Sequence, residues 1–572
     1  MFGQLLTLMY VTLFLGLVVG ALVARKELAK ELHRRISARS LVLLAAILVF
    51  FVIFLLTSLH PAEQLYFDEN IYQGIALNIL KHGSALWCQA GTGYLNQCFS
   101  EIIYHDPTEY SFYIAMAFAA IGISPASASS LQLLIGALSI VWVFVLAAEM
   151  FDAKTAVASA LAFAAMPQLM IWSRTYAVID LPFMSFATLA VALFVMYRRS
   201  GSAKLLIPTL SALGIAACMR IEGVLLLPLF FLFYLTYGDT QMRKRLFSLF
   251  KSLRSSDFIG DEKVMLLLAL GVVMLPQIYL IGSQLHSPDY GQSGNNASLF
   301  SVKNFISNAP DNLLFFTGYY NSPAFFPTLF LPETSALALL GIIVLALGWK
   351  GKNRIQTLLL LLAWIIVYML FYDFFYAGSA IYGVDVRFML QLLPAIAIFA
   401  GMAISGIAEY GSAFLSNFYG VWQSRTWEYA SFAALSLAFI ALPFYMAIPS
   451  FAIQPSAMPQ QGLALGAVAF IYSNGASVVP RNCTVFSQTP DIWYEIGVDA
   501  AATGQLPPNG NIGNNCAVYD YGYWCMAPVP GNNVCNVTLS TYKAQALLTQ
   551  RINGSYESKA AGIYRLYDNA SK

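Results

Sequence analysis

Residues 41–59 read LVLLAAILVFFVIFLLTSL, a run of nineteen residues without a charged side chain. A helix of about 20 apolar residues crosses the hydrocarbon core of a bilayer, so this run predicts a membrane-spanning helix. The whole chain has the same character: 58% of its 572 residues are hydrophobic and 10% are charged, whereas about a quarter of the residues in a soluble domain are charged. This composition excludes a soluble enzyme, and the net charge of +2 excludes a nucleic-acid binder held by phosphate contacts.

Similar apolar runs recur along the chain and predict a multi-spanning α-helical membrane protein with about 11–13 spanning helices. We expect them near 2–24, 41–59, 111–124, 129–150, 155–172, 181–197, 204–219, 223–237, 264–285, 333–349, 355–372, 388–407 and 429–449. The first run has no basic residues before it and no small-residue cleavage site, so we interpret it as a retained helix and not as a signal peptide.

The distribution of Lys and Arg predicts the orientation, because basic loops stay in the cytoplasm. Basic residues collect at 25–39, 198–204, 243–254 and 350–354, and we assign these segments to the cytoplasmic side. The first large loop at 60–110, the second at 286–332 and everything after 450 are poor in basic residues and are expected outside. The sequence therefore predicts an integral protein of the plasma membrane, or of the endoplasmic reticulum in a eukaryote.

Cysteines test this orientation, because disulfides persist in oxidising compartments. Six of the seven lie in segments that are expected outside: Cys88 and Cys98 in the first loop, and Cys483, Cys516, Cys525 and Cys535 in the tail. The even numbers predict one disulfide in the loop and two in the tail, with a pairing in the tail that spacing does not decide. Five N-x-S/T sequons lie on the same side.

The chain divides into a membrane domain at 1–450 and a tail at 451–572. The tail loses the long apolar runs, gains Asn, Gly, Pro and Cys, and contains short strand-like pieces at Cys483–Ser487 and Ile563–Tyr567. We expect it to form a small extracytoplasmic α+β domain.

Two adjacent carboxylates, Asp68 and Glu69, follow the second span and are expected just above the outer leaflet. Neighbouring residues cannot point the same way on a helix or strand, so one would face a reaction as a general base and the other would orient a partner. The alternative is a helix N-terminus, where acidic residues are favoured.

His105 and Asp106 form a second polar group, directly before the third apolar run. His105 is a candidate acid, metal ligand or phosphate donor, and the alternative is a turn set by Pro107. Metal ligation is the weakest interpretation, because no set of His, Asp and Glu at a metal-ligand spacing recurs nearby.

Three lone arginines, Arg174, Arg220 and Arg387, lie at outer helix ends against the positive-inside pattern. A guanidinium group binds phosphate oxygens with two hydrogen bonds and keeps its charge when it is partly desolvated. We therefore predict that they bind the phosphate of a lipid carrier. The alternative is contact with lipid head groups or pairing with Asp180, Glu222 and Asp385, each close in sequence to one Arg.

These residues resemble the motifs of the C-type membrane glycosyltransferases (GT-C), nearest to the protein O-mannosyltransferase and aminoarabinose-transferase branches. The resemblance is carried by Phe67–Tyr72 with Ala76, Ile79, Leu80 and Gly83, by Tyr104–Pro107 with Tyr110 and Tyr113, by Ser173–Arg174 with Asp180–Pro182, and by Arg387–Phe388 with Leu393–Pro394. It implies a GT-C fold and an inverting glycosyltransferase that moves a hexosyl or pentosyl group from a polyprenyl-phosphate donor to an acceptor on the outer membrane face.

The resemblance also implies roles for individual residues. Asp68 would be the catalytic base with Glu69 as its orienting partner, Arg174, Arg220 and Arg387 would bind the donor phosphate, His105 and Asp106 would serve the acceptor side, and Asp180 and Tyr72 would support the site. The implied partners are the lipid-linked donor, membrane lipid and an acceptor that is protein, lipid or glycan, with no nucleic acid. Because a monophosphate leaves, we expect no cofactor and no required metal.

Two other functions fit parts of the sequence. Residues 519–524 read YDYGYW, which partly resembles the W-W-D-Y-G motif of oligosaccharyltransferases, although an aromatic strand pinned by disulfides is the favoured interpretation. A lipid or ion transporter, or a membrane scaffold, is the alternative from another class. Transporters place ionisable groups near the bilayer midplane, whereas the polar groups here gather at the outer interface, which favours an enzyme.

Overall fold

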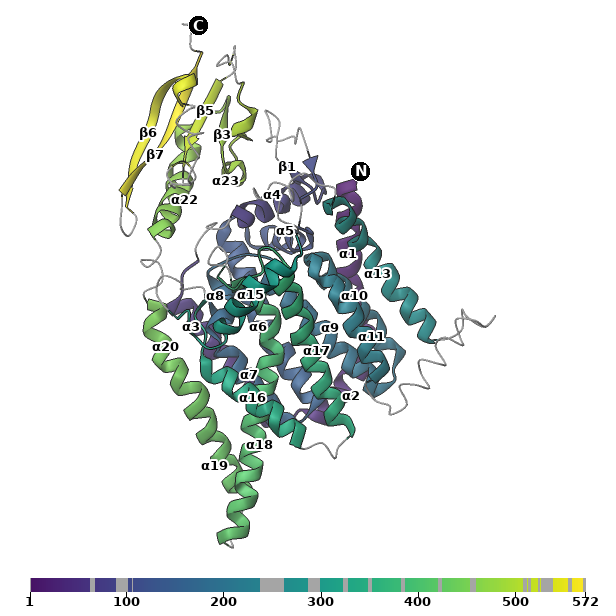
Figure 1. The fold of residues 1–572 in the computed structure, drawn as a ribbon. Helices are drawn as coiled ribbons and strands as arrows, with labels where there is room; N and C mark the ends of the chain where they lie inside the picture. The colour runs from purple at the N-terminus through teal and green to yellow at the C-terminus, as the bar shows by residue number, and fades with distance from the viewer. Residues whose placement is uncertain are drawn as a thin grey trace.

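The computed structural model describes residues 2–61, 67–88, 101–104, 106–236, 262–285, 299–321, 328–347, 352–381, 386–419, 424–452, 459–507, 512, 516–522, 525, 539–553 and 558–568. Within these ranges, a bundle of apolar helices carries a small sheet at one end (Figure 1). We refer to this end of the bundle as the sheet side.

Seven described helices are long and apolar enough to cross a membrane, or eight if a bent pair counts as one span. The long elements are α1 Phe2–Val23, α3 Ala38–Ser58, α6 Pro125–Met150, α9 Asp180–Ser200, α17 Lys352–Phe374, the 3₁₀ turn η6 Val386–Leu392 with α18 Leu393–Tyr419, and α19 Ser424–Ser436 with α20 Leu442–Ala452, joined by the π-helical turn η7 Leu437–Ala441. The chain is therefore an integral membrane protein, as the sequence predicts.

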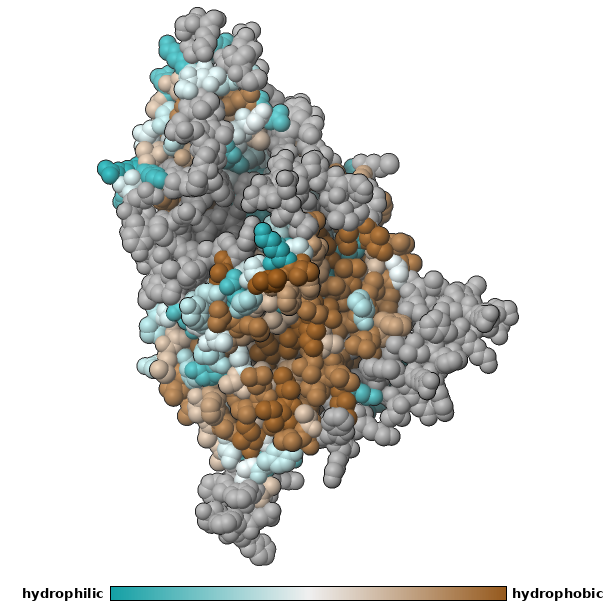
Figure 2. Space-filling model, viewed as in Figure 1, coloured by the Kyte–Doolittle hydropathy of each residue, from teal (hydrophilic) through white to brown (hydrophobic). Residues whose placement is uncertain are grey.

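Shorter apolar helices complete the bundle. They are α5 Glu109–Ile121, α10 Leu206–Met219 with the turn η1 Ala203–Leu205 before it, α11 Leu226–Thr236 with the turn η2 Ile221–Leu225 before it, and α16 Pro332–Leu347. Helix α13 Glu262–Leu285 packs beside α10. Apolar side chains cover the visible face of the bundle, whereas the part with the sheet is more hydrophilic (Figure 2).

The span expected at 155–172 is broken in the structure. It consists of α7 Ala153–Ala164 and α8 Pro167–Arg174, which bend by 61° at the break. Pro167 begins α8, and a proline at this position has no N–H to offer the preceding turn, which explains why α7 ends before it. The bend leaves Arg174 at the end of a short helix of its own.

Two basic segments that the structure describes, 25–35 and 198–204, lie at the end of the bundle opposite the sheet. Helix α2 Arg25–Arg35 lies there, and Lys204 forms an ion pair with Glu27 at 2.8 Å across the gap between η1 and α2 (Figure 1). This grouping of the predicted cytoplasmic residues at one end is consistent with the orientation inferred from Lys and Arg.

On the sheet side, polar helices and a two-stranded sheet cover the bundle. The first loop begins with α4 Phe67–His82 and contains β1 Trp87–Cys88, which pairs antiparallel with β2 Glu101–Ile102. Helix α15 Val302–Phe315 lies in the second large loop. The N-terminal half of α1 contacts the first loop, because the Ala85 N–H donates to the Gly3 carbonyl at 3.0 Å and the Tyr10 hydroxyl bonds the Thr108 hydroxyl at 2.9 Å.

The C-terminal region is a five-stranded mixed sheet of order β4-β3-β5-β7-β6, packed with α22 Pro459–Val478 and α23 Pro490–Glu495. The strands are β3 Cys483–Ser487, β4 Ala500–Ala502, β5 Cys516–Tyr521, β6 Lys543–Asn553 and β7 Ser558–Tyr567. Strand β3 is parallel to β4 and β5, and β7 is antiparallel to β5 and β6. The predicted fold class, a helical membrane protein with a small C-terminal α+β region, is confirmed.

A disulfide joins Cys483 to Cys516 across the neighbouring strands β3 and β5. Cys88 and Cys525 are disulfide-bonded as well, while Cys98 and Cys535 lie outside the described residues. Cys218 is free and buried in α10. The sequence thus predicted disulfides in the correct segments.

Candidate active site

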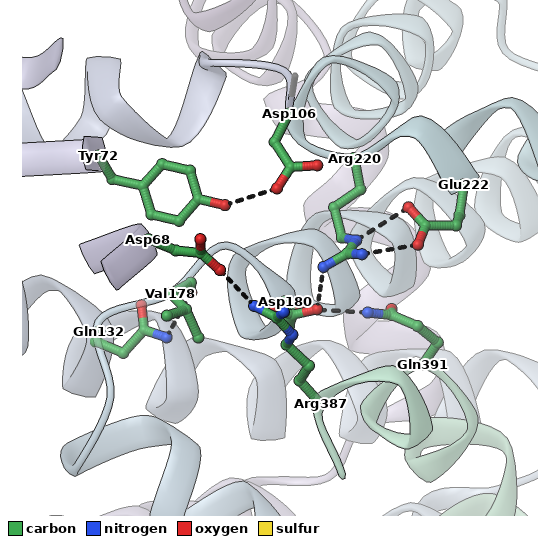
Figure 3. Close-up of polar contacts among 10 residues, drawn as sticks. All are labelled: Asp68, Tyr72, Asp106, Gln132, Val178, Asp180, Arg220, Glu222, Arg387 and Gln391. Carbon is green, nitrogen blue, oxygen red and sulfur yellow. Dashed lines mark hydrogen bonds and ion pairs between the residues drawn. The ribbon is translucent and has the colours of Figure 1, made fainter. Parts of the chain in front are cut away.

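Asp68 lies in the first turn of α4, at the point where the first loop meets the bundle. Its Oδ2 accepts a hydrogen bond from Arg387 Nη1 at 2.7 Å, although 319 residues separate the two in sequence (Figure 3). Its Oδ1 accepts a hydrogen bond from the hydroxyl of Tyr104 at 3.0 Å. About a fifth of each side chain in the Asp68–Arg387 pair is exposed, 21% and 20%, so the pair is accessible from outside the core.

Arg387 reaches this place from η6, the 3₁₀ turn that precedes α18. Its guanidinium carbon lies 5.4 Å from the centre of the Phe388 ring, and the guanidinium carbon of Arg220 lies 5.1 Å from the same ring. Tyr372 of α17 stacks on Phe388 with ring centres 4.9 Å apart. Two of the three predicted arginines therefore converge around one aromatic ring, where cation–π attraction helps to fix them.

Arg220 is held by carboxylates from two elements. Its Nε and Nη2 donate to Glu222 Oε2 and Oε1 at 3.0 and 2.8 Å, and its Nη1 forms an ion pair with Asp180 at the start of α9 (Figure 3). The side chain is buried, with 7% of the residue exposed. The pairing alternative in the sequence analysis thus holds for Arg220, and this guanidinium braces the turn between α10 and α11.

Neighbouring amides tie this brace to two further helices. Gln391 Nε2 donates to the Asp180 carbonyl at 3.2 Å, and Gln277 Nε2 of α13 donates to the Arg220 carbonyl at 3.0 Å. Buried polar groups in an apolar surrounding are costly unless they are hydrogen-bonded, so these contacts stabilise the ends of α9 and α10.

Glu69 points away from Asp68. Its Oε1 accepts a hydrogen bond from the Ala177 backbone N–H at 2.6 Å, and 1% of the residue is exposed. Ala177 lies in the connection between α8 and α9, so this contact attaches α4 to the bundle. The geometry accordingly gives Glu69 a role in placing the helix that carries Asp68.

Asp106 and Tyr72 form a second contact on the same rim. The Tyr72 hydroxyl donates to Asp106 Oδ2 at 3.1 Å (Figure 3). Burial, followed by the nearby carboxylates, raises the pKa of Tyr72 well above its usual value. Burial and the Asp68 carboxylate likewise raise the pKa of Tyr104, so both phenols stay protonated and donate hydrogen bonds. His105, predicted as their neighbour in the site, lies outside the described residues.

Arg174 stands apart from this cluster. It is half-buried at the end of α8, and in the described part of the chain no hydrogen bond or ion pair joins it to Asp68, Asp180 or Arg387. Its sequence neighbour Asp180 pairs with Arg220 and not with Arg174. Of the three predicted arginines, Arg220 and Arg387 therefore converge at the Phe388 ring, and Arg174 lies apart from them.

Sequence reasoning missed two contributors to the site. The Tyr104 hydroxyl bonds the Asp68 carboxylate, and Gln391, which follows Arg387 by four residues on η6, bonds the Asp180 carbonyl. Tyr104 belongs to the family-like element Tyr104–Pro107, so its presence in that motif was the one available signal.

The aromatic motif in the tail is part of a packed core. Asp520 in β5 accepts hydrogen bonds from Trp493 Nε1 at 2.9 Å and from the Ser487 hydroxyl at 2.7 Å, and 3% of it is exposed. Burial raises the pKa of Asp520 to about 6. These contacts favour the structural interpretation of the YDYG stretch over acceptor recognition.

Comparison with known proteins supports the resemblance. The family model described as dolichyl-phosphate-mannose-protein mannosyltransferase matches residues 106–253, which include Arg220 but neither Asp68 nor Arg387. The crystal structure of ArnT from Cupriavidus metallidurans bound to undecaprenyl phosphate matches 94% of this chain and 99% of its own, with a TM-score of 0.55 and 14% sequence identity. No curated protein matches the chain in sequence.

A second similar structure is the Archaeoglobus fulgidus oligosaccharyltransferase tethered with an acceptor peptide that contains an NVT sequon. It matches 89% of this chain and 69% of its own, with 13% identity and a TM-score of 0.49. The ArnT match shows that the chain has the fold of a GT-C glycosyltransferase, as the motifs predict.

Proposed function

We propose that the chain is an inverting glycosyltransferase that moves a sugar from a polyprenyl-phosphate donor to an acceptor on the outer membrane face. The observation that carries the proposal is the 2.7 Å contact between Asp68 and Arg387. A carboxylate and a guanidinium at one partly exposed point are the two groups that this transfer needs, a base for the acceptor and a cation for the leaving phosphate.

Asp68 is the proposed general base. An acceptor hydroxyl attacks the anomeric carbon from the face opposite the phosphate, a new carbon–oxygen bond forms, and the bond between that carbon and the phosphate oxygen breaks. The hydroxyl proton passes to the Asp68 carboxylate, and the configuration at the anomeric carbon inverts. The Tyr104 hydroxyl, 3.0 Å from Oδ1, holds the carboxylate, while Oδ2 accepts the Arg387 hydrogen bond until a donor phosphate takes that guanidinium and frees Oδ2 for the acceptor.

Arg387 is the proposed ligand of the donor phosphate. Arg220 is already engaged by Asp180 and Glu222, so we assign the phosphate to Arg387 and keep Arg174 as a second candidate. A phosphate that binds Arg387 competes with Asp68 for the same guanidinium. Binding of the donor would therefore free the Asp68 carboxylate from Arg387, so that Asp68 can act as a base only while the donor is bound.

The ArnT match supports the lipid-linked donor, since that protein was crystallised with undecaprenyl phosphate. Helix α4, which carries Asp68, lies on the sheet side, opposite the basic helix α2, which supports placement on the outer face (Figure 1). The charged groups of the site, Asp68, Asp180, Arg220 and Arg387, cluster beside α4 at this end of the bundle, which argues against a transporter with a midplane site. The identity of the sugar and of the acceptor stays open in this proposal.

The experiment is a donor-consumption assay on purified protein in liposomes, with polyprenyl-phosphate sugars as donors and proton NMR of the product. We expect consumption that depends on Asp68 and a product whose anomeric configuration is opposite to that of the donor. Retention of configuration, or consumption that continues unchanged without the Asp68 carboxylate, would contradict the mechanism.

A further inference from the structure

The helix that carries Asp68 is also the helix on which the C-terminal region rests. Gly74 and Lys81 lie seven residues apart on α4, which is about two turns, so they share one face. Asp68 lies six residues before Gly74, about a third of a turn away around the helix axis. Helix α23 packs against α4, so α4 lies between the C-terminal region and the bundle (Figure 1).

Asp491 of α23 packs directly against Gly74 at this interface. A Cβ atom placed on Gly74 would lie 2.0 Å from Asp491 Oδ1, so the carboxylate occupies the space that any other residue would need. Trp87 Nε1 of β1 points at Asp491 Oδ2 from 3.4 Å, and 5% of Asp491 is exposed. One carboxylate thus meets both α4 and the strand that follows it.

A second contact lies two turns further along the same face. The ammonium group of Lys81 lies 3.8 Å from the centre of the Tyr494 ring, and Tyr494 follows Asp491 by three residues on α23. Asp499 acts on Lys81 electrostatically. The interface therefore fixes α4 at two points along its axis, which restricts both its rotation and its tilt.

The carboxylate at this interface is costly to bury. Burial raises the pKa of Asp491 to about 7, and the Trp87 hydrogen bond offsets this in part. An apolar residue would fill the same space without that cost. The stability of the C-terminal core therefore does not explain why a carboxylate, that of Asp491, packs against Gly74 of α4.

We infer that Asp491 is a positioning residue for the transfer reaction, through which the C-terminal region seats α4 and thereby holds Asp68 beside Arg387. This inference rests on the proposed function. Asp491 touches Gly74 and Trp87, and α4 transmits the constraint as a rigid element to its first turn. A displacement of about 1 Å at a reacting group can cost a hundredfold in rate, so a loose α4 lowers turnover.

The test compares Asp491→Ala, Asp491→Asn, Gly74→Ala and the double variant Gly74→Ala/Asp491→Ala in the full chain. Turnover and KM for the donor are measured, together with hydrogen–deuterium exchange of the peptide that covers 67–82. We expect Asp491→Ala and Gly74→Ala each to lower kcat at least tenfold with little change in KM, and to speed exchange in α4. Asp491→Asn keeps the size and the acceptor for Trp87, so it should restore kcat to within about threefold of the wild-type value.

The double variant separates a specific contact from general damage. Removing the carboxylate makes room for the new methyl group, so the double variant should lose less activity than the product of the two single losses. Asp568→Asn is the matched control, because Asp568 accepts the Ile512 N–H within the C-terminal region. It should leave α4 exchange and kcat unchanged.

Unchanged α4 exchange in Asp491→Ala, or strictly multiplicative losses in the double variant, would overturn the inference. The exchange measurement does not depend on catalysis. If wild-type protein consumed no donor, the proposed function would fail, and the exchange data alone would still decide whether Asp491 seats α4.

Discussion

Replacing Asp68 with asparagine tests the proposed base most directly. Asparagine has nearly the same shape, and its carbonyl oxygen can still accept the Tyr104 hydrogen bond, so local structure should persist. A positioned general base contributes about 10²–10⁴ in rate, which corresponds to roughly 2.7–5.4 kcal/mol of transition-state stabilisation. We therefore expect kcat to fall by about two to four orders of magnitude.

The same substitution should not weaken binding of the donor, although it lowers kcat. In the wild-type protein the phosphate must displace Asp68 from Arg387 across a 2.7 Å contact, whereas a neutral amide competes weakly for the guanidinium. Donor affinity should therefore be unchanged or higher in Asp68→Asn. The assay is consumption of a polyprenyl-phosphate sugar in liposomes, with donor affinity measured separately by isothermal titration. A kcat within threefold of wild type, or a donor affinity that falls tenfold, would refute this account of the pair.

Three further outcomes follow from the same geometry. Arg387→Ala should weaken donor binding and lower kcat by a factor of about 10²–10³, while the protein still inserts into the membrane normally. Arg387→Lys keeps a positive charge and should lose less donor affinity and less kcat. Equal donor affinity in wild type and Arg387→Ala would count against the assignment of Arg387 to the phosphate. Gly341→Ala should lower the thermal unfolding midpoint, because its methyl group would lie 1.9 Å from a backbone oxygen of α18. Such overpacking costs about 1–3 kcal/mol. Gly271→Ala in α13 is the control: its methyl group meets nothing within 4 Å and alanine is the better helix former, so the midpoint should stay or rise. The stability of the C-terminal region should fall as pH rises from about 4 to about 7, because burial raises the pKa of Asp520 to about 6 and that of Asp491 to about 7. The folded state therefore binds more protons than the unfolded state in that window, and for Asp520 the loss of stability is roughly 3 kcal/mol. Asp520→Asn should flatten the pH dependence of unfolding followed by tryptophan fluorescence.

The spanning helices could be predicted because the bilayer imposes one simple rule on length and polarity. The run at 41–59 corresponds to α3 Ala38–Ser58, and the run at 333–349 corresponds to α16 Pro332–Leu347. The bend between α7 and α8 was not predicted, because apolar composition is continuous across it and only Pro167 marks it. Helices α15 and α22 were also missed, since they lie outside the long apolar runs. Helix α4 was foreseen only in the alternative interpretation of Asp68 and Glu69 as a helix N-terminus, which the structure bears out.

The convergence of Asp68 with Arg387 was foreseen from motif order and not from spacing, because no local pattern relates residues 319 positions apart. The partners of the other two arginines could not be predicted from the sequence. Arg220 and Arg174 are alike in sequence context, since each has an acidic residue nearby. Only packing decides that Asp180, closer in sequence to Arg174, pairs with Arg220.

The same contacts have a consequence for biogenesis. Asp180 begins α9 and Arg220 follows the next long helix, α10, so this buried pair can form as soon as the nascent chain contains both helices. Asp68, in contrast, must wait until the segment with Arg387 has been translated and inserted, because domains form in order of synthesis. The site is therefore assembled late, and a polypeptide truncated before Arg387 would insert its early spans and still lack a working centre.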